Sequence, residues 1–140
     1  MLATARHEAE MSASRPIVVH HPEGTPGQEM PGTERRQQFE REGRWASWIR
    51  IESGNVTSWH HHAANDTYVY VSRGSATIEF GPGGAERVVA GAGDFFHVPP
   101  GTIHRETIDS DLDFDGFVLR LGSGPERVDV DGPDAADGSA

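Results

Sequence analysis

The chain has 140 residues, a formal net charge of −10, 17 glycines, 9 prolines and no cysteine. This length suits one domain with a single core, and the negative charge argues against a protein that binds nucleic acid through phosphate contacts. The absence of cysteine excludes disulfides, zinc–thiolate sites and a cysteine nucleophile. A metal site in this chain would therefore use His, Asp or Glu.

The sequence shows no sign of a membrane or secreted protein. No apolar run approaches the roughly 18 residues of a membrane span, and the first 15 residues lack the apolar centre of a secretory signal. The net charge indicates solubility rather than a charged partner. We therefore expect a cytoplasmic protein that binds neither membrane nor nucleic acid.

Short strands separated by Gly- and Pro-rich turns are expected along most of the chain. Residues 1–14 are polar and are expected to be disordered. Residues 15–43 are expected to form an N-terminal arm, with an edge strand at 16–19 and a charged segment at 33–42 that favours a strand over a short helix. Further strands are expected at 45–51, 56–62, 68–71, 75–80, 86–90, 95–98, 104–108 and 114–121.

This pattern predicts an all-β single domain. Many short strands with regular turns and no convincing helix are typical of a jelly-roll barrel or sandwich. The barrel core is expected at residues 44–121. From residue 122 to residue 140 the composition shifts to aspartates separated by small residues, which predicts a flexible acidic tail.

Two histidines one residue apart are the strongest chemical signal. His60 and His62 lie in the expected strand at 56–62. In a strand, side chains two residues apart leave the same face, roughly 6.6 Å apart at about 3.3 Å per residue. Two imidazoles placed in this way can bind one metal ion, whereas on a helix the usual spacing would be four residues. His61, between them, is expected to face outward.

Two motifs containing these histidines resemble the conserved motifs of the cupin superfamily. The first is Gly54-x5-His60-x-His62-x3-Asp66-x7-Gly74, and the second is Gly93-x5-Pro99-x-Gly101-x2-His104. The resemblance covers roughly residues 44–121 and implies a cupin-type jelly-roll β-barrel. It also implies that His104, which opens a strand after a Pro-Gly turn, reaches the His60/His62 pair.

Carried over residue by residue, the resemblance implies the metal ligands His60, His62, Asp66 and His104. Asp66 stands where the cupin pattern usually has Glu, and Asp is shorter by about one methylene, roughly 1.5 Å. Three alternatives stay open: Asp66 binds the metal directly, Asp66 holds a water beside it, or Thr67 takes its place. Ile108 stands where the second motif usually ends in Asn, a departure from which little follows.

Strand parity suggests further candidates near the metal. Ser58 shares the face of His60 and His62, Tyr68 and Tyr70 share the parity of Asp66, and Glu106 shares that of His104. Of these, Tyr70 and Glu106 are predicted, with Asp66, to be catalytic. The alternative is that the tyrosines line the core and that Glu106 lies near the rim.

The resemblance implies a metal-dependent enzyme with a small-molecule substrate. The first expectation is a non-haem dioxygenase acting on a small enolisable or phenolic compound, with one divalent transition metal per chain, Fe(II) favoured and Zn, Ni or Mn as alternatives. A second is a zinc-dependent isomerase, cyclase or decarboxylase of polyketide-tailoring type. A third is a small-molecule-binding or sensor cupin without catalysis. Cupins commonly pair their sheets, so a homodimer is expected.

Overall fold

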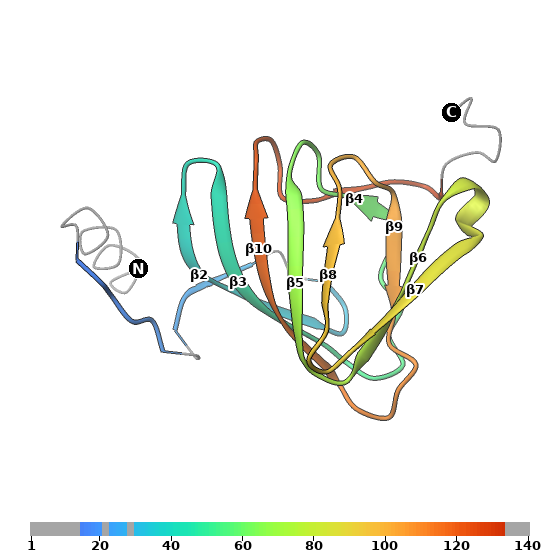
Figure 1. Cartoon of the computed structure of the whole chain (residues 1–140), viewed down its shortest axis with the longest axis horizontal. Coiled ribbons are helices and arrows are strands. Elements are labelled where there is room, and N and C mark those ends of the chain that lie inside the picture. The colour runs from blue at the N-terminus through green and yellow to red at the C-terminus, as the bar shows by residue number, and fades with distance from the viewer. Residues whose placement is uncertain (1–14, 21–22, 28–29, 134–140) are drawn as a thin grey trace.

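The computed structural model describes residues 15–20, 23–27 and 30–133, and within these residues almost all regular structure is β-strand. Two antiparallel sheets form a jelly-roll barrel, which confirms the expected all-β fold (Figure 1). One sheet has 6 strands in the order β1-β2-β3-β10-β5-β8, and the other has 5 in the order β11-β4-β9-β6-β7.

Most strands lie where the sequence predicts them. Their bounds are Thr25–Pro26 (β1), Thr33–Arg41 (β2), Arg44–Ile51 (β3), His60–His61 (β4), Asp66–Arg73 (β5), Ser75–Phe80 (β6), Glu86–Gly91 (β7), Phe95–Val98 (β8), His104–Thr107 (β9), Phe114–Leu121 (β10) and Val128–Asp129 (β11). Among the described residues, the only helical turn is a 3-residue 3-10 turn, Pro82–Gly84, in the Gly-rich connection between β6 and β7.

The core lies between the two sheets, and strand parity decides which side chains reach it. Along β5, Val69 and Val71 are buried, whereas Tyr68 and Tyr70 are 42% and 37% exposed. The odd-numbered residues of β5 therefore face the barrel interior. The buried hydrophobic side chains are Ile51, Val69, Val71, Ala76, Ile78, Ala90, Val98, Ile108, Phe114 and Val118.

Two of the expected strands differ in the structure. Residues 16–19, expected as an edge strand, form no strand, and β1 occupies the sheet edge beside β2 instead. The strand expected at 56–62 is interrupted, because Val56 makes only an isolated bridge to Thr107 and regular pairing resumes at His60. Thr57 N still donates a hydrogen bond to Glu106 O at 2.9 Å, so this segment runs alongside β9.

The barrel also extends beyond both ends of the expected core at 44–121. On the N-terminal side, β2 pairs with β3 along its length, so part of the expected arm is a full strand of the six-stranded sheet. On the C-terminal side, β11 pairs with β4 in register Asp129 with His60. The segment from residue 122 to residue 133, here called the C-terminal strap, is thus joined to the barrel by backbone pairing. The expectations for residues 1–14 and 134–140 lie outside the described residues.

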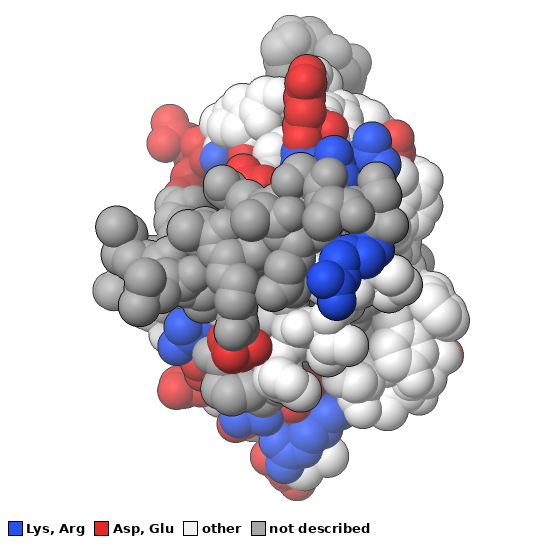
Figure 2. Space-filling view, turned by 90° about the vertical axis from the view of Figure 1, so that its left-hand side faces the viewer, with Lys and Arg blue, Asp and Glu red and all other residues white. Residues whose placement is uncertain are grey.

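In their helical content and on one face of the molecule, the described residues show no feature typical of membrane or nucleic-acid binding. None of the described residues belongs to a helix with the length and apolar character needed to cross a membrane. On the side of the molecule at the β2 edge, acidic and basic side chains are interspersed (Figure 2). A single-sign basic patch, the usual footprint of nucleic-acid binding, does not appear among the described residues drawn on that face.

Two motif glycines give a matched test of the fold. Gly54 and Gly74 both have positive φ, 84° and 76°, but a Cβ on Gly74 would lie 2.6 Å from Asp113 O, whereas one on Gly54 would meet nothing within 4 Å. We expect Gly54→Ala to lower the free energy of unfolding by about 1 kcal/mol, the cost of the left-handed conformation. Gly74→Ala should cost at least about 1 kcal/mol more, because the backbone must also move. Urea unfolding measures both, and equal losses would contradict this placement of Gly74 against residue 113.

Candidate metal centre

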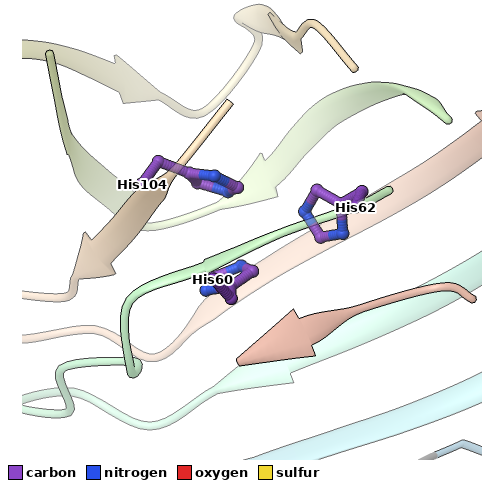
Figure 3. A group of neighbouring side chains, drawn as sticks. All are labelled: His60, His62 and His104. Atoms are coloured by element: carbon purple, nitrogen blue, oxygen red, sulfur yellow. The ribbon is translucent and has the colours of Figure 1, made fainter. Parts of the chain in front are cut away.

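Three histidines from two neighbouring strands meet inside the barrel. His60 begins β4, His62 follows directly after β4, and His104 begins β9, where it pairs in register with His60. One ring nitrogen from each lies within 4.8 Å of the others, and the residues are only 1%, 4% and 1% exposed (Figure 3). His104 therefore lies beside the His60/His62 pair, as the sequence predicts.

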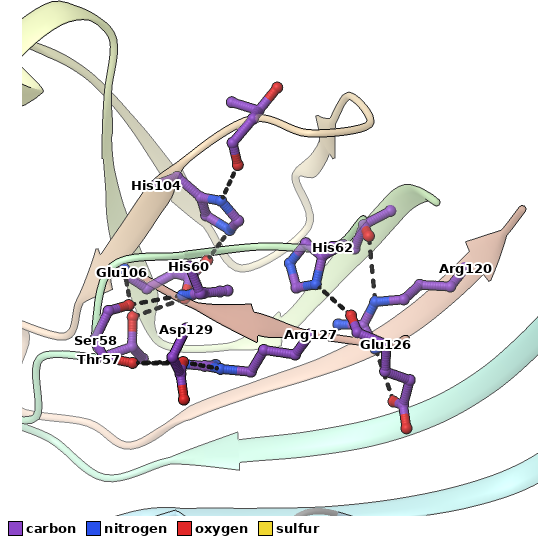
Figure 4. A network of polar contacts seen from close by, with 12 residues as sticks. Thr57, Ser58, His60, His62, His104, Glu106, Arg120, Glu126, Arg127 and Asp129 are labelled. Carbon is purple, nitrogen blue, oxygen red and sulfur yellow. Dashed lines mark hydrogen bonds and ion pairs between the residues drawn. The ribbon is translucent and has the colours of Figure 1, made fainter. Parts of the chain in front are cut away.

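Each imidazole is oriented by a hydrogen bond from Nδ1 to a backbone carbonyl. These bonds join His60 to Ser58 O at 2.7 Å, His62 to Glu126 O at 2.8 Å and His104 to Thr102 O at 3.0 Å (Figure 4). A carbonyl oxygen can only accept, so each Nδ1 carries the hydrogen, and the lone pair of the neutral ring is on Nε2. A backbone acceptor on the far nitrogen is the usual support of a metal-binding histidine.

Burial keeps two of the three rings neutral. It lowers the pKa of His60 to about 4 even though the Glu106 carboxylate opposes the shift. It also lowers the pKa of His62 to about 2, with a further contribution from the positive charge of Arg120. Both rings therefore have their Nε2 lone pairs available near neutral pH, as metal ligation requires.

Glu106 brings a carboxylate to the same point. Its Oε2 lies 2.9 Å from His104 Nε2, and its Oε1 lies 3.7 Å from His60 Nε2. Thr57 holds it in place, because Thr57 Oγ1 donates to Oε1 at 3.0 Å and accepts from the Glu106 amide at 2.8 Å. Glu106, a candidate because it shares the parity of His104, therefore lies beside His104 rather than at the rim.

The charges of Glu106 and His104 stabilise each other. Burial alone would raise the pKa of Glu106, but the neighbouring His104 and His60 rings outweigh it and hold that pKa well below its usual range. Burial alone would lower the pKa of His104, and the Glu106 carboxylate raises it above the usual value. Glu106 is therefore an ionised acceptor near neutral pH.

The donor set fits a divalent metal ion. His104 Nε2 is buried and lies 2.9 Å from Glu106 Oε2, but among the described residues it forms no hydrogen bond of good geometry. A buried nitrogen of this kind requires a partner at the centre of the cluster. Three imidazole nitrogens and one carboxylate oxygen suit Fe, Zn, Ni or Mn. His60, His62 and His104 are thus positioned to bind one such ion.

Asp66 and Tyr70 do not lie at this cluster. The carboxylate of Asp66 is 39% exposed and accepts a hydrogen bond from His97 Nε2 at 2.8 Å. Tyr70 packs against Phe95 on the outer face of the sheet, with ring centroids 4.8 Å apart. Both residues have the outward parity of β5, so the structure does not support Asp66 as a ligand or Tyr70 as a catalytic group. Of the alternatives considered for the acid's position, only Thr67 faces the interior, where it lines the cavity.

The other two parity candidates also lie elsewhere. Ser58 is exposed, and its hydroxyl donates to Asp129 Oδ1 at 2.9 Å and accepts from Arg127 Nη2 at 2.7 Å. Its contribution to the cluster is its backbone carbonyl. Tyr68 lies on the outer face, stacked on the His97 ring at 4.6 Å.

A narrow cavity with about 50 Å³ of free space opens beside the histidines, and most of its wall is apolar. Its apolar lining consists of Met30, Ile49, Ile51, Val69, Phe96, Val98, Phe114 and Val118. Its charged lining, apart from the histidines, consists of Glu106, Arg35, Arg120 and Arg127. This mixed lining suits a small organic ligand with polar groups at defined positions.

Sequence reasoning missed the arginines and the C-terminal strap. Arg120 has a recognisable signal, because it shares the parity of the buried residues Phe114 and Val118 in β10. Glu126 has none, because its position beside His62 depends on contacts between segments 64 residues apart.

The comparisons with solved structures agree with this architecture. The polyketide cyclase RemF from Streptomyces resistomycificus superposes with a TM-score of 0.68 at 18% identity, covering 83% of this chain and 86% of that one. KdgF from Halomonas sp. gives a TM-score of 0.63 at 20% identity, with 79% and 96% coverage. Oxalate decarboxylase from Lactobacillus farciminis, in a formate complex, gives 0.62 at 14% identity, with 76% of this chain and 33% of that chain covered. At these identities the likeness shows the fold.

Family membership rests on the sequence itself. A search of curated proteins finds no match. The family model described as the cupin domain matches residues 47–117, which is half of the chain and contains all three clustered histidines. The chain therefore belongs to the cupin family.

Proposed function

We propose that this cupin is a metal-dependent enzyme in which His60, His62 and His104 hold one divalent transition metal ion. The observation that carries the proposal is the arrangement of the three rings. Each Nδ1 is bound to a backbone carbonyl, and one ring nitrogen from each lies within 4.8 Å of the others. In each ring the Nδ1 hydrogen is thereby directed away from the cluster, which leaves Nε2 as the nitrogen that can face a metal ion once the ring is neutral.

Glu106 is the proposed proton acceptor of the reaction. It is ionised, fixed by Thr57 and next to the metal position. A substrate that binds the metal through an oxygen would present its neighbouring acidic hydrogen to this carboxylate. Asp66 and Tyr70 have no part in this proposal, because they lie on the outer face.

The chemistry that we favour is that of a non-haem dioxygenase. When bound, a divalent metal polarises a substrate oxygen, and Fe(II) also exchanges electrons with dioxygen. Three histidine ligands leave coordination positions for both reactants. The apolar cavity suits a small enolisable or phenolic substrate, and Glu106 can remove the proton that activates it.

The alternative is non-oxidative chemistry with zinc, such as isomerisation, cyclisation or decarboxylation. The position of Glu106 favours this alternative too, because a fixed carboxylate can take up a proton and return it to another atom of the same substrate. Cyclisation is suggested by the likeness in fold to a polyketide cyclase.

We also retain the homodimer as a proposal. Four aromatic residues form a row across the outer face of the six-stranded sheet, because Trp48 is in register with Phe117, Phe117 with Tyr70 and Tyr70 with Phe95. Phe95 and Phe117 are 77% and 48% exposed. Such a face is suited to pairing with the same face of a second copy.

Metal content tests the proposed ligands. Elemental analysis of untagged protein should find about one metal ion per chain in the wild type, and His62→Ala should lower the affinity by more than about tenfold because it removes a ligand. His97→Ala is the matched control, because His97 is paired with Asp66 outside the cluster. Equal metal content in both variants, or none in the reconstituted wild type, would contradict the proposal.

Oxygen uptake by the same protein preparations distinguishes the two reaction classes. With enolisable and phenolic substrates, consumption of oxygen by iron-loaded protein would support the dioxygenase. Product formation by zinc-loaded protein without oxygen uptake would support the alternative. Metal binding with no turnover of any substrate would leave a ligand-binding cupin.

Glu106→Gln separates a proton acceptor from a metal ligand. Glutamine keeps the size of the side chain but cannot take up the proton, so we expect kcat to fall by about 10² to 10⁴ while the metal content stays at one ion per chain. Glu79→Gln is a suitable control, because Glu79 is also largely buried but pairs with Arg105 away from the cavity. Loss of the metal in Glu106→Gln would instead show that Glu106 is a ligand, and unchanged kcat would exclude its catalytic role.

A further inference from the structure

The cavity beside the histidines has a cationic wall formed by two buried arginines. Arg35 of β2 and Arg120 of β10 are 6% and 5% exposed, and both line the cavity. Arginine is almost never buried to this extent without partners that balance its charge. The acidic groups around the two guanidinium groups therefore indicate what the cavity can bind.

A single carboxylate supports both arginines. Arg35 Nη2 and Arg120 Nη1 donate to the same oxygen, Glu126 Oε1, the latter at 3.0 Å. Gln37 Nε2 donates to the other oxygen at 2.7 Å. Neither Glu126 nor Gln37 lines the cavity, whereas both arginines do.

Among the described residues, these two guanidinium groups have one directly bonded carboxylate between them. Burial and the charge of Arg35 lower the pKa of Arg120 to about 10, although the carboxylates of Glu126 and Glu106 oppose this shift. The third cavity arginine, Arg127, does not add to the excess, because Asp129 pairs with it at 2.9 Å. A divalent metal held by three neutral histidines would add two further positive charges. Among the described residues that line the cavity, Glu106 supplies the one carboxylate that opposes them.

The two arginines also retain unused hydrogen-bond donors. A guanidinium has five N–H groups. Arg120 uses Nε for Thr67 Oγ1 at 3.2 Å and Nη1 for Glu126, and Arg35 uses Nη2 for Glu126. Within the part of the chain that the structure describes, no other hydrogen bond from either guanidinium is found.

The arginines lie close to the metal position, because Glu126 connects them to it. The backbone oxygen of Glu126 accepts from His62 Nδ1 at 2.8 Å, and its side chain reaches Arg120 (Figure 4). The same carboxylate also accepts from Arg35. A small ligand in the cavity can therefore reach both the metal and the guanidinium groups.

We propose that the substrate is a small organic carboxylate whose carboxylate group binds Arg35 and Arg120 while its reactive oxygen-bearing end faces His60, His62 and His104. The placement of the reactive end rests on the proposed function; the carboxylate site itself does not. The arginine fork matches the two oxygens of a carboxylate. One negative charge matches the excess of guanidinium groups over directly bonded carboxylates among the described residues, whereas a phosphate would bring a second charge towards Glu106 and Glu126.

Matched acids and esters test this site in the wild-type protein. Pyruvate, 2-oxobutyrate and phenylpyruvate would each be titrated by calorimetry beside their methyl esters, with inorganic phosphate as a further probe. Metal-free protein is used first, because any preference for the acid must then come from protein groups. We expect at least one acid to bind about tenfold or more tightly than its ester.

Variants then assign the preference to the arginines. Arg120→Lys keeps the charge but loses the fork, and Arg120→Gln combined with Glu126→Gln removes one charge of each sign from the buried group. Both changes should lower the affinity for the acid by about tenfold and bring the ratio of acid affinity to ester affinity towards one. Arg50→Gln, which alters an arginine paired with Asp115 outside the cavity, should leave the ratio unchanged.

The outcomes separate this inference from the proposed function. Equal binding of acids and esters by the wild type, or no binding of any acid, would overturn the carboxylate site even if the histidines hold a metal. Tighter binding of phosphate than of every acid would overturn it in favour of a phosphate ligand. An acid preference that depends on Arg120 in a protein that binds no metal would support the site while the proposed function fails.

Discussion

The site depends on three hydrogen bonds from imidazole nitrogens to backbone carbonyls. Ser58, Thr102 and Glu126 supply these carbonyls, and a carbonyl oxygen can accept but never donate. The bonds therefore fix the orientation of each ring and the nitrogen that carries its hydrogen. Because the acceptors belong to the backbone, the arrangement is as rigid as the pairing of β4 with β9 and β11. These histidines are thus a candidate metal site for two reasons. They lie close together, and each Nδ1 is bound to a carbonyl, which leaves Nε2 for a metal ion.

The C-terminal strap connects the metal position to the rest of the cavity. Glu126 accepts from His62 through its backbone and from Arg35 and Arg120 through its side chain. The pairing of β11 with β4 holds this residue in place. A change in the strap would therefore act on one histidine and on both buried arginines at once. The barrel strands line the cavity, and the strap supplies the carboxylate that binds the two buried arginines.

Much of this arrangement follows from local sequence, and the part that does not follows from contacts across the chain. Glycine and proline turns with alternating strands predict the barrel, and the two spaced motifs predict that His60, His62 and His104 meet. The motif pattern does not place Asp66 correctly, because β5 begins at that residue and its side chain has outward parity. Thr67 faces the interior instead. Local patterns carry no information on the strap, since its acidic composition resembles a solvated tail and its position depends on pairing with β4, nearly 70 residues earlier.

A metal-bound crystal structure would test the central claim most directly. Anomalous diffraction collected at the absorption edge of the bound metal locates that ion independently of any activity. The account predicts one peak per chain, bounded by the Nε2 atoms of His60, His62 and His104, with each Nδ1 still donating to its carbonyl. A peak bound through Nδ1, a peak at Asp66 and His97 on the outer face, or no peak in protein grown with the metal would contradict it.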